Sequence, residues 1–212
     1  MKARTRVELD RKADSQLVSQ ADHTDKANRV PELLALMDAY DWASVDDIAV
    51  DEDARREGSR RFQKLLDDAG LRLDGSVLDL ACGTNTVAYS HPDTVAVDND
   101  PQKIKQLRND GIKAILADIE DLPFEEKSFD YVVAFSPPLQ PVVHHKGGYV
   151  SFGVDREWSK RIVEAALKIA RREVLIASYF VALHPPYEDR VEKRDDKGFQ
   201  WVLYRAGDDP LP

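Results

Sequence analysis

Several features are scarce or absent in this chain of 212 residues, and each absence excludes a class of protein. A single cysteine allows no internal disulfide, which suits a reducing compartment. No apolar run approaches the roughly 20 residues that span a bilayer. The basic N-terminus is not followed by a hydrophobic segment, so it does not resemble a secretory signal. We therefore expect a cytoplasmic protein that does not enter a membrane.

Basic residues are also outnumbered, with 30 Lys and Arg against 39 Asp and Glu and a net charge of −9. Proteins that bind long nucleic acids usually carry a basic domain or stripe. The arginine pairs at 55–56, 60–61 and 171–172 lie among acids or on predicted helices and indicate solvated helix faces. Nucleic acid is therefore not favoured as a partner, although charge alone does not exclude it. The oligomeric state stays open.

Glycine is scarce where a nucleotide would bind. Gly83 is the only glycine between residues 76 and 110, so a Gly-x-Gly-x-x-Gly fingerprint is missing. A pyrophosphate needs the second close approach to the backbone that this fingerprint supplies. A nicotinamide or flavin dinucleotide is therefore a poor fit.

What is present centres on residues 77–85. Four residues that suit a buried strand, 77–80, lead into a turn of small side chains, and polar residues follow where a helix could begin. A strand that ends in such a turn lets a ligand come close to bare backbone amides. The residues after the strand are Ala81, Cys82, Gly83, Thr84 and Asn85.

A second acidic position supports a ligand site. Nineteen residues after Asp79, the apolar run 94–97 ends in Asp98. The second strand of a nucleotide-binding α/β unit presents a carboxylate to a ribose at this place. The ligand implied has a ribose but no diphosphate at the turn, which is the shape of S-adenosylmethionine.

Short apolar segments alternate with helical patterns along the chain. Strands are predicted at 75–80, 94–98, 112–117, 130–135 and 173–179. Helices are predicted from Pro31, over 53–69, over 101–109 behind the cap Asp100, and over 155–172. This order predicts an α/β, Rossmann-like three-layer sandwich with a mostly parallel seven-stranded sheet. Residues 190–194 and 199–205 predict an antiparallel hairpin at its end, and the N-terminal helices form an extension.

Two groups of motifs carry a family resemblance. Residues 77–84 with Val97-Asp98 form the first group, and residues 117–124 with 128–133 form the second. At this spacing the chain resembles the class I S-adenosylmethionine-dependent methyltransferases from about residue 75 to 205. The resemblance implies S-adenosylmethionine as cofactor, S-adenosylhomocysteine as product, and no metal. It also implies a methyltransferase domain at residues 73–212 behind a polar tail and helical extension at 1–72.

The same resemblance implies roles for the residues of the first two strand ends. Asp79 would hold the turn or the ammonium group of the methionine part. The backbone of Ala81, Cys82, Gly83 and Thr84 would pass beneath that part. Asp98 would accept hydrogen bonds from the ribose hydroxyls, and Asn99 would flank the adenine.

Further along the chain, Asp118 would take the adenine amino group and the Ile119 amide a ring nitrogen. Phe135 and Ser136, which end the fourth strand, would lie near the sulfonium. The chain departs from the family at Asn85, where a third glycine is common, and the spacing to Asp98 is short by about one helical turn. Asn85 is therefore predicted either to touch the methionine carboxylate or to mark a different loop.

The acceptor side rests on two groups of residues. Ser136-Pro137-Pro138 resembles the motif of amino-methyltransferases that act on adenine, cytosine or glutamine nitrogens, but Leu139 stands where an aromatic residue would stack. The alternative is a rigid turn that leaves a strand. Residues 137–154 are expected to form a structureless binding loop, in which Tyr149 is a candidate substrate contact.

His144 and His145 lie in the same segment and are candidates for a general base, with solvated loop histidines as the alternative. Ser136 is the third candidate for the catalytic step. Adjacent histidines rarely share a metal, and no cysteine cluster accompanies them, so no zinc site is predicted.

The function predicted is methyl transfer to an oxygen or nitrogen nucleophile. The Leu-Pro-Phe and Ser-Phe-Asp runs and the acidic composition favour a small-molecule acceptor. The alternatives are methylation of a nucleobase or protein amine through Ser136-Pro137-Pro138, and a subunit that binds the cofactor without catalysis.

Overall fold

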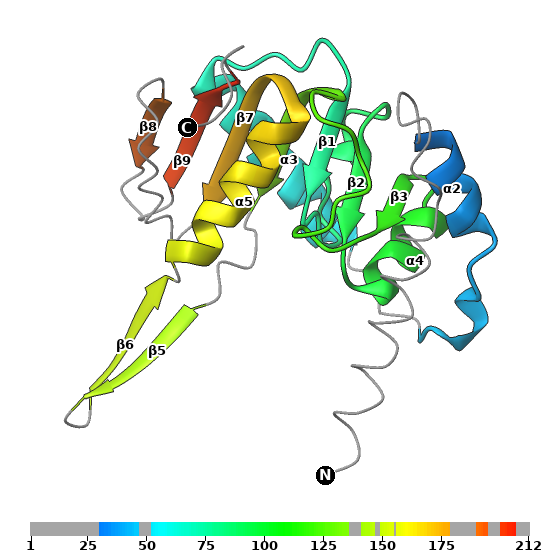
Figure 1. Cartoon of the computed structure of the whole chain (residues 1–212), viewed down its shortest axis with the longest axis horizontal. Coiled ribbons are helices and arrows are strands. Elements are labelled where there is room, and N and C mark those ends of the chain that lie inside the picture. Colours follow the sequence, from blue (N-terminus) through cyan, green and yellow to red (C-terminus); the bar gives the residue numbers. More distant parts are fainter. Residues whose placement is uncertain are drawn as a thin grey trace.

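The computed structural model describes residues 30–46, 52–135, 141–146, 149–154, 156–178, 190–194 and 200–206. Its main sheet has seven strands in the order β3-β2-β1-β4-β7-β9-β8 (Figure 1). These strands are β1 (Val77–Leu80), β2 (Val95–Asp98), β3 (Lys113–Leu116), β4 (Phe129–Phe135), β7 (Ala170–Ser178), β8 (Arg190–Arg194) and β9 (Gln200–Arg205). The helices are α2 (Val30–Asp38), α3 (Glu52–Ala69), α4 (Pro101–Asn109) and α5 (Arg156–Ile169), with short 3₁₀ helices η1 (Trp42–Ser44) and η2 (Val87–Tyr89).

The five strands from β3 to β7 are parallel, and β9 is antiparallel to both of its neighbours. Strand β8 therefore runs in the direction of the first five strands, with β9 inserted between β7 and β8. The predicted α/β fold, with its mostly parallel sheet and antiparallel end hairpin, is confirmed. From β1 the chain builds outward to β2 and β3, and then returns to β4 on the other side. This change of direction places the switch point of the sheet beside β1, where open α/β sheets bind ligands.

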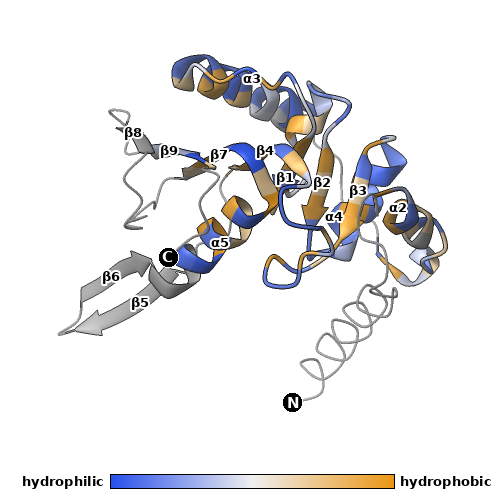
Figure 2. Ribbon diagram, turned by 45° about the horizontal axis from the view of Figure 1, so that its top comes forward, coloured by the Kyte–Doolittle hydropathy of each residue, from blue (hydrophilic) through white to orange (hydrophobic). Residues whose placement is uncertain are grey.

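Helices α3 and α5 cover opposite faces of the sheet (Figure 1). Alternate residues of β4 show this, because Tyr131 and Val133 belong to the cluster that contains Phe62 of α3, while Val132 and Ala134 belong to the cluster that contains α5. The period of two in side-chain direction along a strand explains the division. In Figure 2, β2 is hydrophobic along its length, while α3 alternates hydrophilic and hydrophobic residues.

The connection from β1 to β2 contains no α-helix, although all of residues 81–94 are described. Only η2 occupies it, and no α-helix begins at Thr84 or Asn85, where the sequence allowed one. Helix α3 packs against η2 from the N-terminal side of the chain.

Two other boundaries differ from the sequence prediction. Helix α5 ends at Ile169 rather than near Arg172, because Ala170 already pairs with Phe129 in the sheet. The connection 137–154, expected to be structureless, contains the strands β5 (Pro141–Lys146) and β6 (Tyr149–Val154), which pair antiparallel as a separate two-stranded sheet. Among the described residues, no helix is long and apolar enough to cross a membrane.

Candidate functional site

A pocket of about 440 Å³ opens at the carboxyl ends of β1, β2 and β4. Its volume lies in the usual range for small-molecule sites. The walls combine apolar side chains with a few polar groups. The lining residues are Leu80, Ala81, Cys82, Gly83, Thr84, Asn85, Val97, Asp98, Asn99, Lys103, Ala117, Ile119, Phe135 and Ile162.

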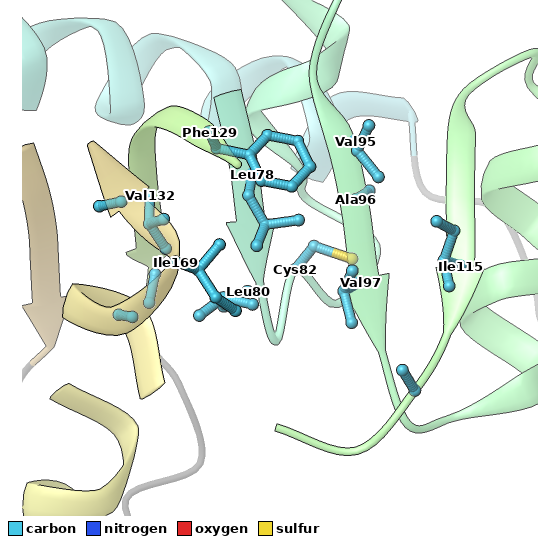
Figure 3. Packing of buried hydrophobic residues seen from close by; sticks show 14 of the residues in the cluster. Leu78, Leu80, Cys82, Val95, Ala96, Val97, Ile115, Phe129, Val132 and Ile169 are labelled. Atoms are coloured by element: carbon cyan, nitrogen blue, oxygen red, sulfur yellow. The ribbon is translucent and has the colours of Figure 1, made fainter. Parts of the chain in front are cut away.

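The turn after β1 brings the backbone to the pocket wall. Ala81 and Gly83 both adopt the left-handed region, with φ of 51° and 59°. A Cβ built on Gly83 would meet no atom within 4 Å, so the missing side chain leaves this part of the pocket open. The Cys82 N–H donates to the Val97 carbonyl over 3.0 Å. Figure 3 shows the Cys82 side chain directed toward Val97 of β2.

Asp98 ends β2 and is 5% exposed. Its Oδ2 accepts a 2.8 Å hydrogen bond from the Gly83 N–H, and its Oδ1 accepts a 3.0 Å bond from the Asp100 N–H. The ammonium group of Lys103 lies 3.5 Å from Oδ1. An ionised carboxylate has about four acceptor sites, so acceptor capacity remains toward the pocket.

Sequence reasoning missed Lys103. This residue lies in the first turn of α4, where Asp100 is the N-cap and accepts from the Gln102 N–H. Its Nζ lies 3.8 Å from Asp100 Oδ2 and 3.5 Å from Asp98 Oδ1, and its side chain is about one-third exposed. The signal was its place three residues after a predicted cap, since helical geometry brings that position back over the strand end.

Asp79 lies beneath the turn and is not a lining residue of the pocket. Its Oδ2 accepts hydrogen bonds from the Thr86 hydroxyl at 2.6 Å and the Val87 N–H at 2.9 Å. Burial raises the pKa of its carboxyl group to about 7, opposed by these two hydrogen bonds and reinforced by the charge of Asp98. Its other oxygen, Oδ1, is buried without a hydrogen-bond partner. These contacts tie Asp79 to the start of η2, where Thr86 is the N-cap.

The loop after β3 contributes Ala117 and Ile119 to the pocket. Asp118, between them, is exposed and is not a lining residue. Its Oδ1 accepts a 3.0 Å hydrogen bond from the Glu120 N–H. The Ala117 N–H donates to the Asp98 carbonyl at 3.1 Å, which joins this loop to the end of β2.

Phe135 forms the wall at the end of β4, and its ring meets Phe62 of α3 edge-on, with centroids 5.9 Å apart. The other apolar walls are side chains that sequence reasoning had assigned to the core or left unassigned. Each lies at or just after a strand end or on the buried face of α5, so the sequence predicts that it is buried. No local pattern shows whether such a residue lines the pocket or belongs to the core. They are Leu80, Val97, Ala117 and Ile162.

The predicted acceptor residues are located only in part. Ser136, Pro137 and Pro138 lie outside the described residues. His144 and His145 belong to β5, where they pair with Ser151 and Val150 of β6, and Tyr149 pairs with Lys146. The structure therefore neither joins these residues to the pocket nor separates them from it.

Comparison with known proteins gives a consistent picture. Residues 77–146 match the family model described as a methyltransferase domain. A protein from Pyrococcus horikoshii shares the fold, with a TM-score of 0.54 and 15% identity over 73% of this chain and 92% of that chain. A methyltransferase from Thermotoga maritima, described as a possible histamine N-methyltransferase, has a TM-score of 0.52 and 13% identity over 74% and 95% of the two chains. No curated protein matches the chain.

Proposed function

We propose that this chain is a class I S-adenosylmethionine-dependent methyltransferase that transfers a methyl group to an oxygen or nitrogen nucleophile of a small molecule. The match of residues 77–146 to a methyltransferase-domain model supports this proposal. The observation that carries this proposal is the pocket at the switch point of the sheet. It brings the Gly83 turn and the Asp98 carboxylate together from two separate motifs.

The residues present fit this cofactor. The turn presents backbone and an open position at Gly83 rather than the paired glycines that a diphosphate needs. Apolar walls at Val97, Ile119 and Phe135 suit the faces of an adenine and the carbon chain of a methionine. The Asp98 carboxylate suits a ribose, since beyond its bonds to the Gly83 and Asp100 N–H groups it retains acceptor capacity for a hydroxyl donor.

We assign the roles accordingly. Asp98 binds the ribose, while Asn99 and the Ile119 amide flank the adenine. Asp118, between the lining residues Ala117 and Ile119 in the chain, takes the adenine amino group. The backbone of residues 81–84 and the side chain of Asn85 hold the methionine part.

The sulfonium of bound S-adenosylmethionine supplies an electrophilic methyl group. The chain therefore needs mainly to align the nucleophile with that methyl and to exclude water. Phe135 limits water at the end of β4, where Ser136 follows directly. We place this function in residues 73–212, with residues 1–72 as an extension.

Ligand binding tests the cofactor assignment. We expect S-adenosylhomocysteine to bind in calorimetry with a dissociation constant on the order of micromolar and to raise the melting temperature by mass action. NAD, with its pyrophosphate, is the matched control and should do neither. A wild-type protein without a thermal shift at saturating S-adenosylhomocysteine would refute the assignment.

A second acceptor class is supported by one observation. Ser136-Pro137-Pro138 follows Phe135 directly, and Phe135 is a pocket wall. A nucleobase or protein amine would meet the methyl from this side. Transfer of labelled methyl to separate metabolite, nucleic-acid and protein pools decides among the acceptors. Label in nucleic acid alone would overturn the small-molecule proposal, and label in none would favour a cofactor-binding subunit.

A further inference from the structure

Helix α3 precedes residue 77, where the match to the methyltransferase model begins. It nevertheless contacts a wall of the pocket, because its Phe62 packs against Phe135. Between β1 and β2, a βαβ unit normally places a crossover helix. Here only η2 stands in that connection, and α3 packs against it. The N-terminal extension therefore supplies the helix beside the motif turn.

Three contacts hold α3 in this place. Arg55 forms an ion pair with Asp110 at the end of α4, with Nη1 and Oδ2 2.7 Å apart. Its guanidinium also lies over the Tyr89 ring, 5.4 Å from the centroid. Phe62, 3% exposed, meets the pocket residue Phe135 edge-on. Together they fix α3 against the connection and the end of β4.

Gly58 lies between these anchors, in the interior of α3. Glycine is the least favourable helix residue apart from proline, so its presence there calls for a steric reason. A Cβ built on Gly58 would lie 3.1 Å from both Cβ and Cγ of Asn85. That distance is shorter than ordinary van der Waals contact. A side chain at position 58 would therefore displace Asn85 or α3 by a few tenths of an ångström.

We propose that Gly58 is a positioning residue for the cofactor: it lets α3 hold Asn85 in the place from which this side chain lines the methionine end of the pocket. The inference rests on the proposed function, since Asn85 is assigned there to the methionine part. It predicts that a side chain at position 58 weakens binding of the amino-acid part of the ligand and leaves binding of the nucleoside part unchanged.

The test is a double-mutant cycle of Gly58→Ala and Asn85→Gly, which removes the Asn85 Cβ as well as its amide, read by calorimetry with two ligands. S-adenosylhomocysteine carries the amino-acid part, and 5′-methylthioadenosine lacks it. We expect Gly58→Ala to weaken S-adenosylhomocysteine binding about fivefold or more, the size of coupling between neighbouring side chains. Binding of methylthioadenosine should stay within about twofold, and the melting temperature should not fall, since alanine favours the helix.

In the Asn85→Gly protein, adding Gly58→Ala should weaken S-adenosylhomocysteine binding less than about twofold, because none of the side-chain atoms that a Cβ at position 58 would meet is left. Lys64→Ala, at an exposed position of α3, is the control and should bind both ligands as the wild type does.

Equal weakening of both ligands, or no weakening of either, overturns the proposal. These outcomes differ from failure of the proposed function itself. Wild-type protein that does not bind S-adenosylhomocysteine removes both, whereas wild-type protein that binds it beside an unaltered Gly58→Ala variant removes only the role of Gly58.

Discussion

The backbone N–H of Gly83 donates a 2.8 Å hydrogen bond to the carboxylate of Asp98. This bond joins the turn after β1 to the end of β2, and thereby couples the two motifs from which the site was first inferred. The carboxylate that we assign to the ribose thus also supports the turn that we assign to the methionine part.

Replacing Asp98 should affect ligand binding strongly. Asp98→Ala removes both the ribose acceptor and the partner of the Gly83 N–H. Charged hydrogen bonds contribute about 1.5–3 kcal/mol, so we expect S-adenosylhomocysteine affinity to fall about tenfold or more in calorimetry. Asp98→Asn keeps one oxygen that accepts from the Gly83 N–H, so this variant should lose less affinity for S-adenosylhomocysteine than Asp98→Ala. Unchanged affinity in Asp98→Ala would contradict the ribose role.

Asp79 should make stability depend on pH. Burial raises the pKa of its carboxyl group from 3.8 to about 7. The folded protein then binds one more proton than the unfolded chain between these values, so its free energy of unfolding falls as pH rises through that window. The slope attributable to Asp79 is about 1 kcal/mol per pH unit, and it levels off above the folded pKa.

Urea unfolding of wild type and Asp79→Asn at fixed ionic strength measures this slope. The stability of the wild type relative to the variant should decrease from about pH 5 to about pH 7. Asp93→Asn, whose side chain is 94% exposed, is the control and should follow the wild type. A difference between wild type and Asp79→Asn that stays constant over this range would contradict the prediction.

The anchor of α3 should contribute to stability. Arg55 and Asp110 are 13% and 25% exposed, and the Tyr89 hydroxyl donates to the same Asp110 oxygen at 2.6 Å. Arg55→Met should lower the free energy of unfolding by about 2 kcal/mol, because a largely buried pair is broken. Lys160→Met breaks a pair that is about half exposed and should cost less than about 0.5 kcal/mol. Equal effects in denaturant melts would argue against the anchor.

Cys82 should be a protected thiol. It is 6% exposed, and burial raises its pKa, with further contributions from the charges of Asp79 and Asp98. We expect a thiol reagent such as Ellman's reagent to react about a hundredfold more slowly with folded than with urea-unfolded protein. Because Cys82 also lines the pocket, S-adenosylhomocysteine should slow the reaction further. Rapid labelling of the folded protein would contradict its placement.

The sequence predicted those features that local patterns encode. A short apolar run such as residues 77–80 is a strand signal in itself, and the spacing from Asp79 to Asp98 sets two strand ends side by side. The sequence allowed a helix to begin at Thr84, but the connection holds only η2. The structureless loop expected at 137–154 contains β5 and β6, because the pairing of two strands is a contact between segments that neither segment encodes by itself.

The rest of the site depends on contacts between distant segments. Ile162 lines the pocket from α5, and no local sequence pattern distinguishes it from the core residues of that helix. The contact of Gly58 with Asn85 joins a helix and a loop that share no periodic pattern. Both relationships depend on how α3 and α5 pack on the sheet, which local sequence patterns do not specify.

Strand β9 has a consequence for how the molecule is made. It follows β8 in the chain but lies between β7 and β8, so within the described residues β8 pairs only with a strand synthesised after it. The sheet can grow on the ribosome as far as β7, and the last two strands then enter together. Until they do, β7 presents an unpaired edge, which is a template for pairing with another chain. Pairing of β9 with β7 closes this edge only after the last strand has been made.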